Sequence, residues 1–379
     1  MDQAISTSPA APVRGWRFAL LCAAVLLAAG FALRFAAFLA SGGTADPLAF
    51  ADAMCRLDCL WYEQIATEGY GGGANTAGRA SWAFFPLAPL WFGIVQQLSG
   101  LPFAAAAMLG ATVAAFWAAV AAWPLFGGNR FAFLAAAGMM LLGPPAVWFT
   151  TGYSESLFVL FGIVALVQLR RRHWIVAGLA IALLGATRLV GVLMVLPMLL
   201  ARLEAHRQSG RDWPSLPQDI LRDGPFLLGV ALAPLGLSLF MATLQLVLGD
   251  GLAFLRVQYA WGRSIDWPWV MLFETMTGAT TPLGLLLALF AVIGLLLALW
   301  LVLRGLRVEA LFLALGIIVP LSGGVLSMPR FLAGLAPFHL AMGLLLGRLW
   351  PVALASLPIW AALGYAATLG WLDSLGIMV

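Results

Sequence analysis

The chain has 379 residues, of which 63% are hydrophobic and 9% are charged. Soluble domains carry about 25% charged residues, so this composition excludes an ordinary soluble protein. All 20 basic residues are arginines that stand mostly singly between hydrophobic segments, so the net charge of +4 does not indicate a nucleic-acid partner. Uncharged runs of about 20 residues recur, which predicts a polytopic α-helical membrane protein. The alternating segments of about 10 residues that a membrane barrel needs are absent.

We predict about eleven membrane-spanning helices. The first follows Arg14 and Arg17 and is too long for the core of a signal peptide, so we expect it to remain uncleaved. Near its outer end, Arg34 is expected to reach toward the lipid headgroups. The predicted spans are 18–40, 103–126, 131–150, 154–170, 174–187, 189–203, 225–248, 282–303, 308–326, 331–348 and 351–372.

Arginine positions set the expected orientation of these spans. The cluster at 170–173, the 202–222 loop and the turn with Arg304 and Arg307 should all be cytoplasmic. With the N-terminus also inside, this holds only if the apolar, proline-containing segment 82–98 makes no full crossing. The stretch between the basic cluster and the 202–222 loop has two readings, one long tilted helix or two short ones.

Three polar regions of a single membrane domain, 1–379, then face the exterior. They are the loop 41–82, the loop 249–281 and a short turn at Arg330. The cytoplasmic side offers only one modest loop and tight turns. A catalytic site should therefore lie at the exterior face.

Asp58 is the most informative residue of the first exterior loop. In an amphipathic helix from about Phe50 to Glu68, it would share the apolar face with Trp61 and Tyr62. A carboxylate in an apolar stripe must be desolvated, paired or functional. We interpret Asp58 as the general base of a membrane enzyme. An ion pair with a nearby arginine that merely holds the loop is the structural alternative.

Two cysteines flank this carboxylate. Cys55 and Cys59 are four residues apart, and successive helical turns give poor geometry for a bridge, so we expect two free thiols. A disulfide is still chemically permitted outside the cytoplasm. Two thiols without a neighbouring histidine or further cysteine are too few for zinc. We predict no metal site and, in the absence of nucleotide-binding motifs, no cofactor.

Glu155 begins a hydrophobic segment directly after Ser154. One reading is a helix start in which Ser154 caps the helix and Glu155 complements its dipole. The other reading is a second acidic group that faces the same cavity as Asp58.

Several arginines have two readings, as phosphate ligands or as interfacial anchors. Arg188 interrupts two apolar runs, Arg330 lies at an exterior edge, and Arg256 and Arg263 lie in the second exterior loop. His339 lies in mid-span without a metal partner, and we expect it to be a hydrogen-bonded structural residue.

Five motifs, spread over about residues 50–340, occur in an order that resembles the PIG-V family of mannosyltransferases, within the GT-C superfamily of membrane glycosyltransferases. Each motif is weak alone, and the ordered set is what carries the resemblance. They are Arg56-x-Asp58-x-x-Trp61-Tyr62-x-x-Ile65-Ala66-x-x-Gly69-Tyr70, Ala83-Phe84-Phe85-Pro86-Leu87, Gly152-Tyr153-Ser154-Glu155-Ser156-Leu157-Phe158, Ala186-Thr187-Arg188 and Arg330-Phe331.

The resemblance implies transfer of a mannose or another hexose from a polyprenyl-phosphate donor to a glycolipid or glycan acceptor. It implies Asp58 as the base and inversion at the sugar. Leu57 departs from the tryptophan often found there in the family, which puts acceptor stacking in doubt. The implied substrate-binding residues are Arg56, Trp61, Tyr62, Glu155, Arg188 and Arg330.

The alanine-rich composition, with arginine as its only basic residue, favours a bacterial inner-membrane protein whose site faces the periplasm. The rival class is a lipid or sugar transporter or flippase, which would also use intramembrane charges such as Arg188 and Glu155. No inverted repeat is apparent, and the polar residues gather at one face, so the transferase is favoured. A related GT-C enzyme that transfers another sugar is a further alternative.

Overall fold

The computed structural model describes residues 15–263, 265–278 and 281–375. In these ranges every regular element is a helix and no strand occurs, as the composition predicts. The first ten helices are α1 (Trp16–Ala40), α2 (Pro47–Met54), α3 (Asp58–Glu68), α4 (Leu87–Ser99), α5 (Phe103–Ala121), α6 (Arg130–Leu141), α7 (Pro145–Thr150), α8 (Glu155–Arg170), α9 (Trp174–Thr187) and α10 (Val195–Gln208). The others are α11 (Leu216–Arg222), α12 (Gly224–Leu232), α13 (Leu235–Leu248), α14 (Ala253–Arg256), α15 (Pro268–Gly278), α16 (Pro282–Leu303), α17 (Arg307–Leu321), α18 (Met328–Gly334), α19 (Ala336–Leu346) and α20 (Trp350–Leu372).

Short 3-10 helices connect several of these elements. They are η1 (Ser81–Ala83), η2 (Trp123–Phe126), η3 (Leu189–Met194), η4 (Trp213–Ser215) and η5 (Val257–Trp261).

The helices have the length and composition of membrane spans. Within the described ranges, six helical stretches are long and apolar enough to cross a bilayer, and α18 with α19 would make a seventh if the bent pair forms one span. Large apolar side chains such as Leu246 and Leu303 are exposed on their outer faces. A bilayer accommodates such faces, which indicates an integral membrane protein. The six are Trp16–Ala40, Phe103–Phe126, Leu189–Gln208, Gly224–Leu248, Pro282–Leu303 and Trp350–Leu372.

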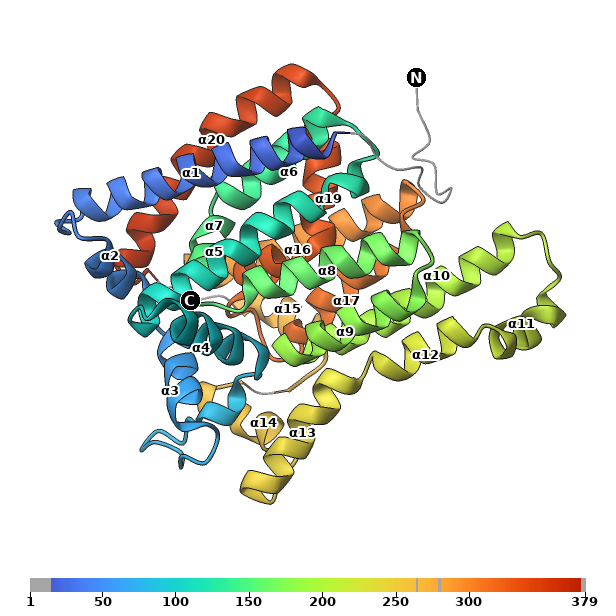
Figure 1. Ribbon diagram of the computed structural model, residues 1–379, viewed down its shortest axis with the longest axis horizontal. Coiled ribbons are helices and arrows are strands. Elements are labelled where there is room, and N and C mark those ends of the chain that lie inside the picture. Colours follow the sequence, from blue (N-terminus) through green and yellow to red (C-terminus); the bar gives the residue numbers. More distant parts are fainter. Residues whose placement is uncertain (1–14, 264, 279–280, 376–379) are drawn as a thin grey trace.

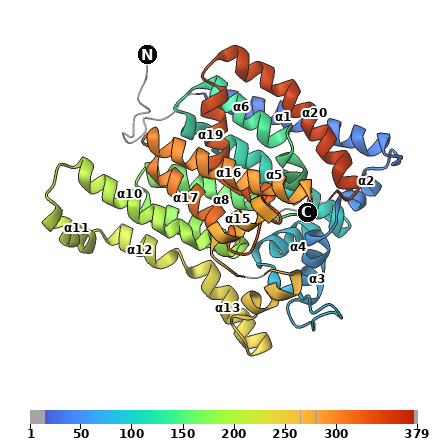
Figure 2. The ribbon, with the colours of Figure 1, turned by 180° about the vertical axis from the view of Figure 1, so that it is seen from behind.

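Helices from distant parts of the chain pack together. In Figure 1, α1 and α20 lie side by side against α6, while α5 and α8 pack together in the interior. The view from behind, Figure 2, shows α10 and α12, joined through α11, projecting as an arm from the bundle. Where α9 meets α12, a Cβ on Gly178 would lie 2.2 Å from the carbonyl oxygen of Gly229, so these backbones touch through glycines, as membrane helices often do.

Three helical segments are broken near the residues predicted to form the site. The expected single helix over 50–68 is wrong, because α2 ends at Met54 and α3 begins only at Asp58. The stretch 174–203 proves to be two segments, which separate at the extended backbone of Arg188. Finally, α18 is bent by 80° from α19.

The apolar segment 82–98 corresponds mainly to α4. This helix has 13 residues. At 1.5 Å per residue it is about 20 Å long, which is shorter than the ~30 Å hydrocarbon core. The segment therefore lacks the helical length for a full crossing.

Two buried polar side chains inside the bundle form hydrogen bonds with backbone carbonyls. Arg34 is only 2% exposed, so its expected reach toward the headgroups is wrong. Its Nη1 donates to the carbonyl of Leu141 at 3.2 Å. That carbonyl has no helical partner because Pro145, four residues on, lacks an N–H. His339 is buried and bonds through Nε2 to the carbonyl of Ala333 at 2.6 Å, which confirms its structural assignment.

Candidate functional site

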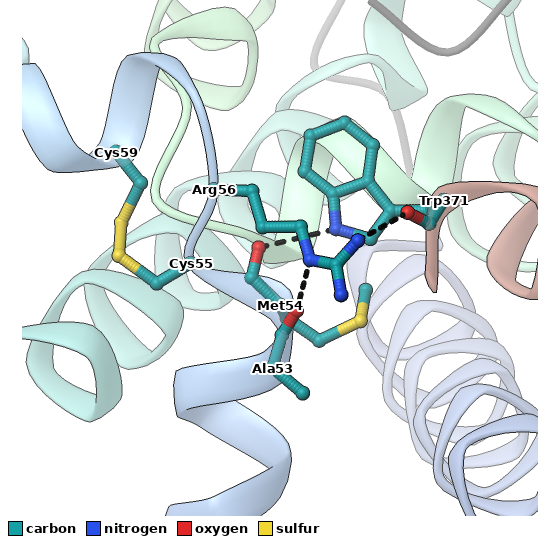
Figure 3. Close-up of a disulfide and its surroundings, with 6 residues drawn as sticks. All are labelled: Ala53, Met54, Cys55, Arg56, Cys59 and Trp371. Atoms are coloured by element: carbon teal, nitrogen blue, oxygen red, sulfur yellow. Dashed lines mark hydrogen bonds between the residues drawn. A yellow bond between two sulfur atoms is a disulfide. The ribbon is translucent and has the colours of Figure 1, made fainter. Parts of the chain in front are cut away.

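Asp58 is the first residue of α3, and a disulfide fixes the turn that leads to it. Figure 3 shows Cys55, which follows α2, bridged to Cys59 in the first turn of α3. The expectation of free thiols is therefore wrong. Its premise was a continuous helix, whereas Cys55 is extended and Leu57 has a φ of 52°, so the chain reverses locally and the two Cα atoms lie 5.3 Å apart.

The disulfide turn packs directly on the segment that carries Glu155. A Cβ on Gly152 would lie 2.4 Å from the Sγ of Cys59 and 3.0 Å from the Cβ of Ala107. Only a glycine fits between these neighbours without displacing them. Gly152, the first residue of the third motif, thus lets the turn of Asp58 and the start of α8 come into contact.

An unbroken chain of ion pairs links the two carboxylates. The Nη1 of Arg330 lies 2.6 Å from Oδ2 of Asp58. On its other side, Nε of Arg330 lies 3.3 Å from Oε1 of Glu155, close enough for an ion pair but not aligned as a hydrogen bond. Glu155 also pairs with Nη2 of Arg188. Four predicted site residues from α3, α8, α18 and the α9–η3 break therefore meet in one cluster.

Burial differs along this cluster. The side chain of Glu155 is fully buried, that of Arg330 is 9% exposed, and that of Asp58 is 19% exposed. Asp58 is thus partly accessible, as is Arg188 at the other end of the cluster, whose side chain is 16% exposed. The ion pair with an arginine, foreseen as the structural alternative, exists. Its arginine, Arg330 of α18, also links Asp58 to the second acidic group, Glu155.

Glu155 lies in the first turn of α8, as the helix-start reading expects, but Ser154 makes no side-chain cap. Instead, the Oγ of Ser154 accepts a hydrogen bond from Nε of Arg188 at 3.2 Å. The hydroxyl thus helps to orient the guanidinium that neutralises Glu155.

Aromatic rings flank Asp58 along α3. Trp61 is half-buried and stacks on Phe84, with centroids 5.7 Å apart, and the edge of Trp261 from η5 approaches it at 6.1 Å. Tyr62 is buried against Phe84 and Phe92. The partly exposed ring beside Asp58 is therefore Trp61, whereas Tyr62 forms part of the supporting core.

Burial raises the pKa of the Tyr62 phenol, and the nearby carboxylates of Asp58 and Glu155 raise it further. The phenol therefore stays protonated at neutral pH and can act only as a neutral hydrogen-bonding group beside the carboxylates.

Arg56 lies outside the cluster. Its Nη1 donates to the carbonyl of Trp371 at 3.2 Å, and its Nε donates to the carbonyl of Ala53 at 3.0 Å (Figure 3). Nη1 also donates to the carbonyl of Leu372 at 2.7 Å, at the end of α20. A cation there satisfies terminal carbonyls and complements the helix dipole. In this structure, Arg56 joins the turn between α2 and α3 to the end of α20.

The structure brings two residues of the 249–281 loop to the site: Arg263, which the sequence offers as a phosphate ligand or an interfacial anchor, and Trp261, to which the sequence gives no role. Arg263 lies near the ion-pair cluster, and Trp261 lies against Trp61. Both belong to a loop with aromatic and basic residues but no recognisable spacing, so only their position in three dimensions connects them to Asp58. In the described ranges, no three histidine, cysteine or acidic side chains are grouped so that they could hold a metal ion.

Comparison with known proteins adds no assignment. No protein-family model matches the chain, and no curated protein matches it. The fold and the cluster therefore define an integral membrane protein with a largely buried ion-pair network beside a disulfide-bridged turn.

Proposed function

We propose that this protein is an inverting membrane glycosyltransferase that resembles the PIG-V family. In this proposal it takes a hexose such as mannose from a polyprenyl-phosphate donor and transfers it to a glycolipid or glycan acceptor. The observation that carries the proposal is the position of Asp58, partly accessible and linked through Arg330 to Glu155 and Arg188. A carboxylate beside several guanidinium groups suits a reaction that needs a base next to an anionic leaving group.

The proposed reaction uses one base and no covalent intermediate. Asp58 takes the proton of an acceptor hydroxyl, and the oxygen attacks the anomeric carbon from the side opposite the phosphate. The bond from that carbon to the phosphate oxygen breaks, and its electron pair leaves with the phosphate. Arg330 contacts Oδ2 of Asp58, so Oδ1 serves as the proton acceptor.

The topology proposed for this reaction has about eleven spans in a GT-C-like bundle, inside a bacterial inner membrane. In this topology the shorter helices α8, α9 and α17 would each be a further span, and α6 together with α7 would form another. The disulfide between Cys55 and Cys59 supports an oxidising, periplasmic location for the first loop. The arginine cluster at 170–172 lies at the opposite end of α8 from Glu155, which agrees with a cytoplasmic position for the cluster.

A lipid donor also needs an apolar surface for its hydrocarbon chain. A groove of about 510 Å³ between α1 and α5 offers one. Phe31 and Phe35 of this groove pack against Phe50 of α2, the helix that precedes the disulfide turn. The lining residues are Ala24, Leu27, Ala28, Phe31, Ala32, Phe35, Thr112 and Phe116.

Reconstitution tests the proposal. The purified protein, in vesicles with a glycolipid acceptor fraction, is given radiolabelled polyprenyl-phosphate mannose and, in parallel, the glucose analogue. Label that becomes covalently attached to the acceptor supports the transferase, and the parallel donors identify the sugar. Movement of the donor across the bilayer without bond formation would instead support the transporter.

A further inference from the structure

Arg263 is held between two anchored points of the second exterior loop. Just before it, the carbonyl of Ala260 accepts a hydrogen bond from Nε of Arg79 at 3.3 Å, and Trp261 packs against the aromatic rings of the first loop. Just after it, the N–H of Asp266 donates to the carbonyl of Ser322 at 2.9 Å. These attachments, on both sides of Arg263, direct it toward the ion-pair cluster.

Three guanidinium groups gather around the ring of Phe331. The Cζ atoms of Arg188, Arg330 and Arg263 lie 5.4, 5.6 and 5.8 Å from its centroid. Each distance is within the range of a cation–π contact. One aromatic ring therefore collects three positive charges that come from three separate parts of the chain.

The carboxylates of the cluster do not balance these charges. Asp58 and Glu155 supply two negative charges against three positive ones, which leaves a formal excess of +1. Arg330 contacts both carboxylates and Arg188 contacts Glu155. The third guanidinium has no such partner.

Arg263 is that third group. In the described part of the chain, no carboxylate oxygen lies within 4 Å of its nitrogens, and its Nη1 donates to the neutral Oε1 of Gln258 at 3.1 Å. Burial lowers the pKa of Arg263; Arg330 and Arg188 lower it further, against the opposing effect of Asp58. An anion bound here would relieve the repulsion among the three arginines.

We propose that Arg263 is the phosphate-binding residue of this site, and that Arg188 and Arg330 serve mainly to hold the two carboxylates. The guanidinium of Arg263 is partly exposed and has no carboxylate partner among the described residues, so it can form the bidentate hydrogen bonds that phosphate oxygens accept. The ligand class is a lipid-linked phosphate ester, and assigning it to a sugar donor rests on the proposed function. When the sugar–phosphate bond breaks, a phosphodiester with one charge becomes a monoester that approaches two, so Arg263 would stabilise the departing group.

Binding of a simple lipid phosphate tests this proposal without any transfer reaction. Farnesyl phosphate and farnesol are titrated into the full-length protein in dodecyl maltoside micelles, and affinity is measured by isothermal titration calorimetry. Arg263→Gln is compared with Arg263→Lys and with Arg256→Gln. Arg256 is the control, because it lies in the same loop but its side chain is 72% exposed and pairs with Asp250 at 2.9 Å.

We expect the wild type and Arg256→Gln to bind farnesyl phosphate more tightly than farnesol. Arg263→Gln should lose about tenfold or more in affinity for the phosphate, with farnesol unchanged, and Arg263→Lys should retain part of the preference. Equal binding by the wild type and Arg263→Gln, a comparable loss in Arg256→Gln, or no preference of the wild type for the phosphate would each overturn the assignment.

The two proposals fail separately. A protein that binds farnesyl phosphate through Arg263 but transfers no hexose would keep the phosphate site and lose the transferase. A protein that transfers hexose, but whose Arg263→Gln variant binds farnesyl phosphate normally, would keep the transferase and lose this site.

Discussion

Opening the disulfide between Cys55 and Cys59 should weaken both the fold and the reaction. The bridge closes a very short loop around Leu57 and Asp58. For so short a loop, the chain-entropy relation gives about 2 kcal/mol at 25 °C. The bridge also retains Leu57 at a φ of 52°, a conformation that disfavours residues other than glycine. If all of this free energy serves to position Asp58, its loss lowers the transfer rate by up to about 30-fold.

Dithiothreitol and the variant Cys55→Ala/Cys59→Ala provide two independent ways to open the bridge. The measurements are the hexose-transfer rate and the unfolding temperature in detergent, with thiol labelling and mass spectrometry to establish the redox state. A Cys22→Ala background removes the one other cysteine of the chain. Complete reduction with neither the rate nor the unfolding temperature changed would refute the positioning role of the bridge.

Two further substitutions test the packing around the site. Gly152→Ala should lower the free energy of unfolding by about 1–3 kcal/mol, because the new Cβ would lie 2.4 Å from the Sγ of Cys59. Gly71→Ala is the control, because nothing lies within 4 Å of a Cβ at that position. Equal unfolding temperatures for the two variants would contradict the clash. Arg56→Gln should cost about 2 kcal/mol through lost charged hydrogen bonds to the end of α20, and should leave the affinity for farnesyl phosphate unchanged. A selective loss of that affinity in Arg56→Gln, at wild-type stability, would place Arg56 in the substrate site.

Composition and apolar runs predicted the helical membrane class because both are local properties of the chain. The long uncharged run at 282–303, for example, forms α16 over the same residues. Local pattern could not predict the break between α2 and α3, since the residues around Asp58 also fit a continuous amphipathic helix. The free-thiol prediction for Cys55 and Cys59 was wrong for the same reason, because it depended on that continuity.

The members of the cluster were recognisable singly, but their partners were not. Asp58 and Arg330 are separated by 272 positions, and no periodicity relates residues so far apart. The ordered motifs suggested that Glu155 and Arg188 share a site with them, and the structure brings all four together. Arg263 belongs to no motif, so only the packing of its loop places it near the others.

The most direct test of the catalytic assignment is hexose transfer by Asp58→Asn, with Asp52→Asn as the control on the exposed face of neighbouring α2. Both variants are compared in the reconstituted assay after gel filtration and thermal unfolding have shown intact folds. We expect Asp58→Asn to lose at least about 10²-fold in rate, whereas Asp52→Asn should transfer hexose like the wild type. Near-normal turnover by folded Asp58→Asn would contradict the assignment of Asp58 as the general base.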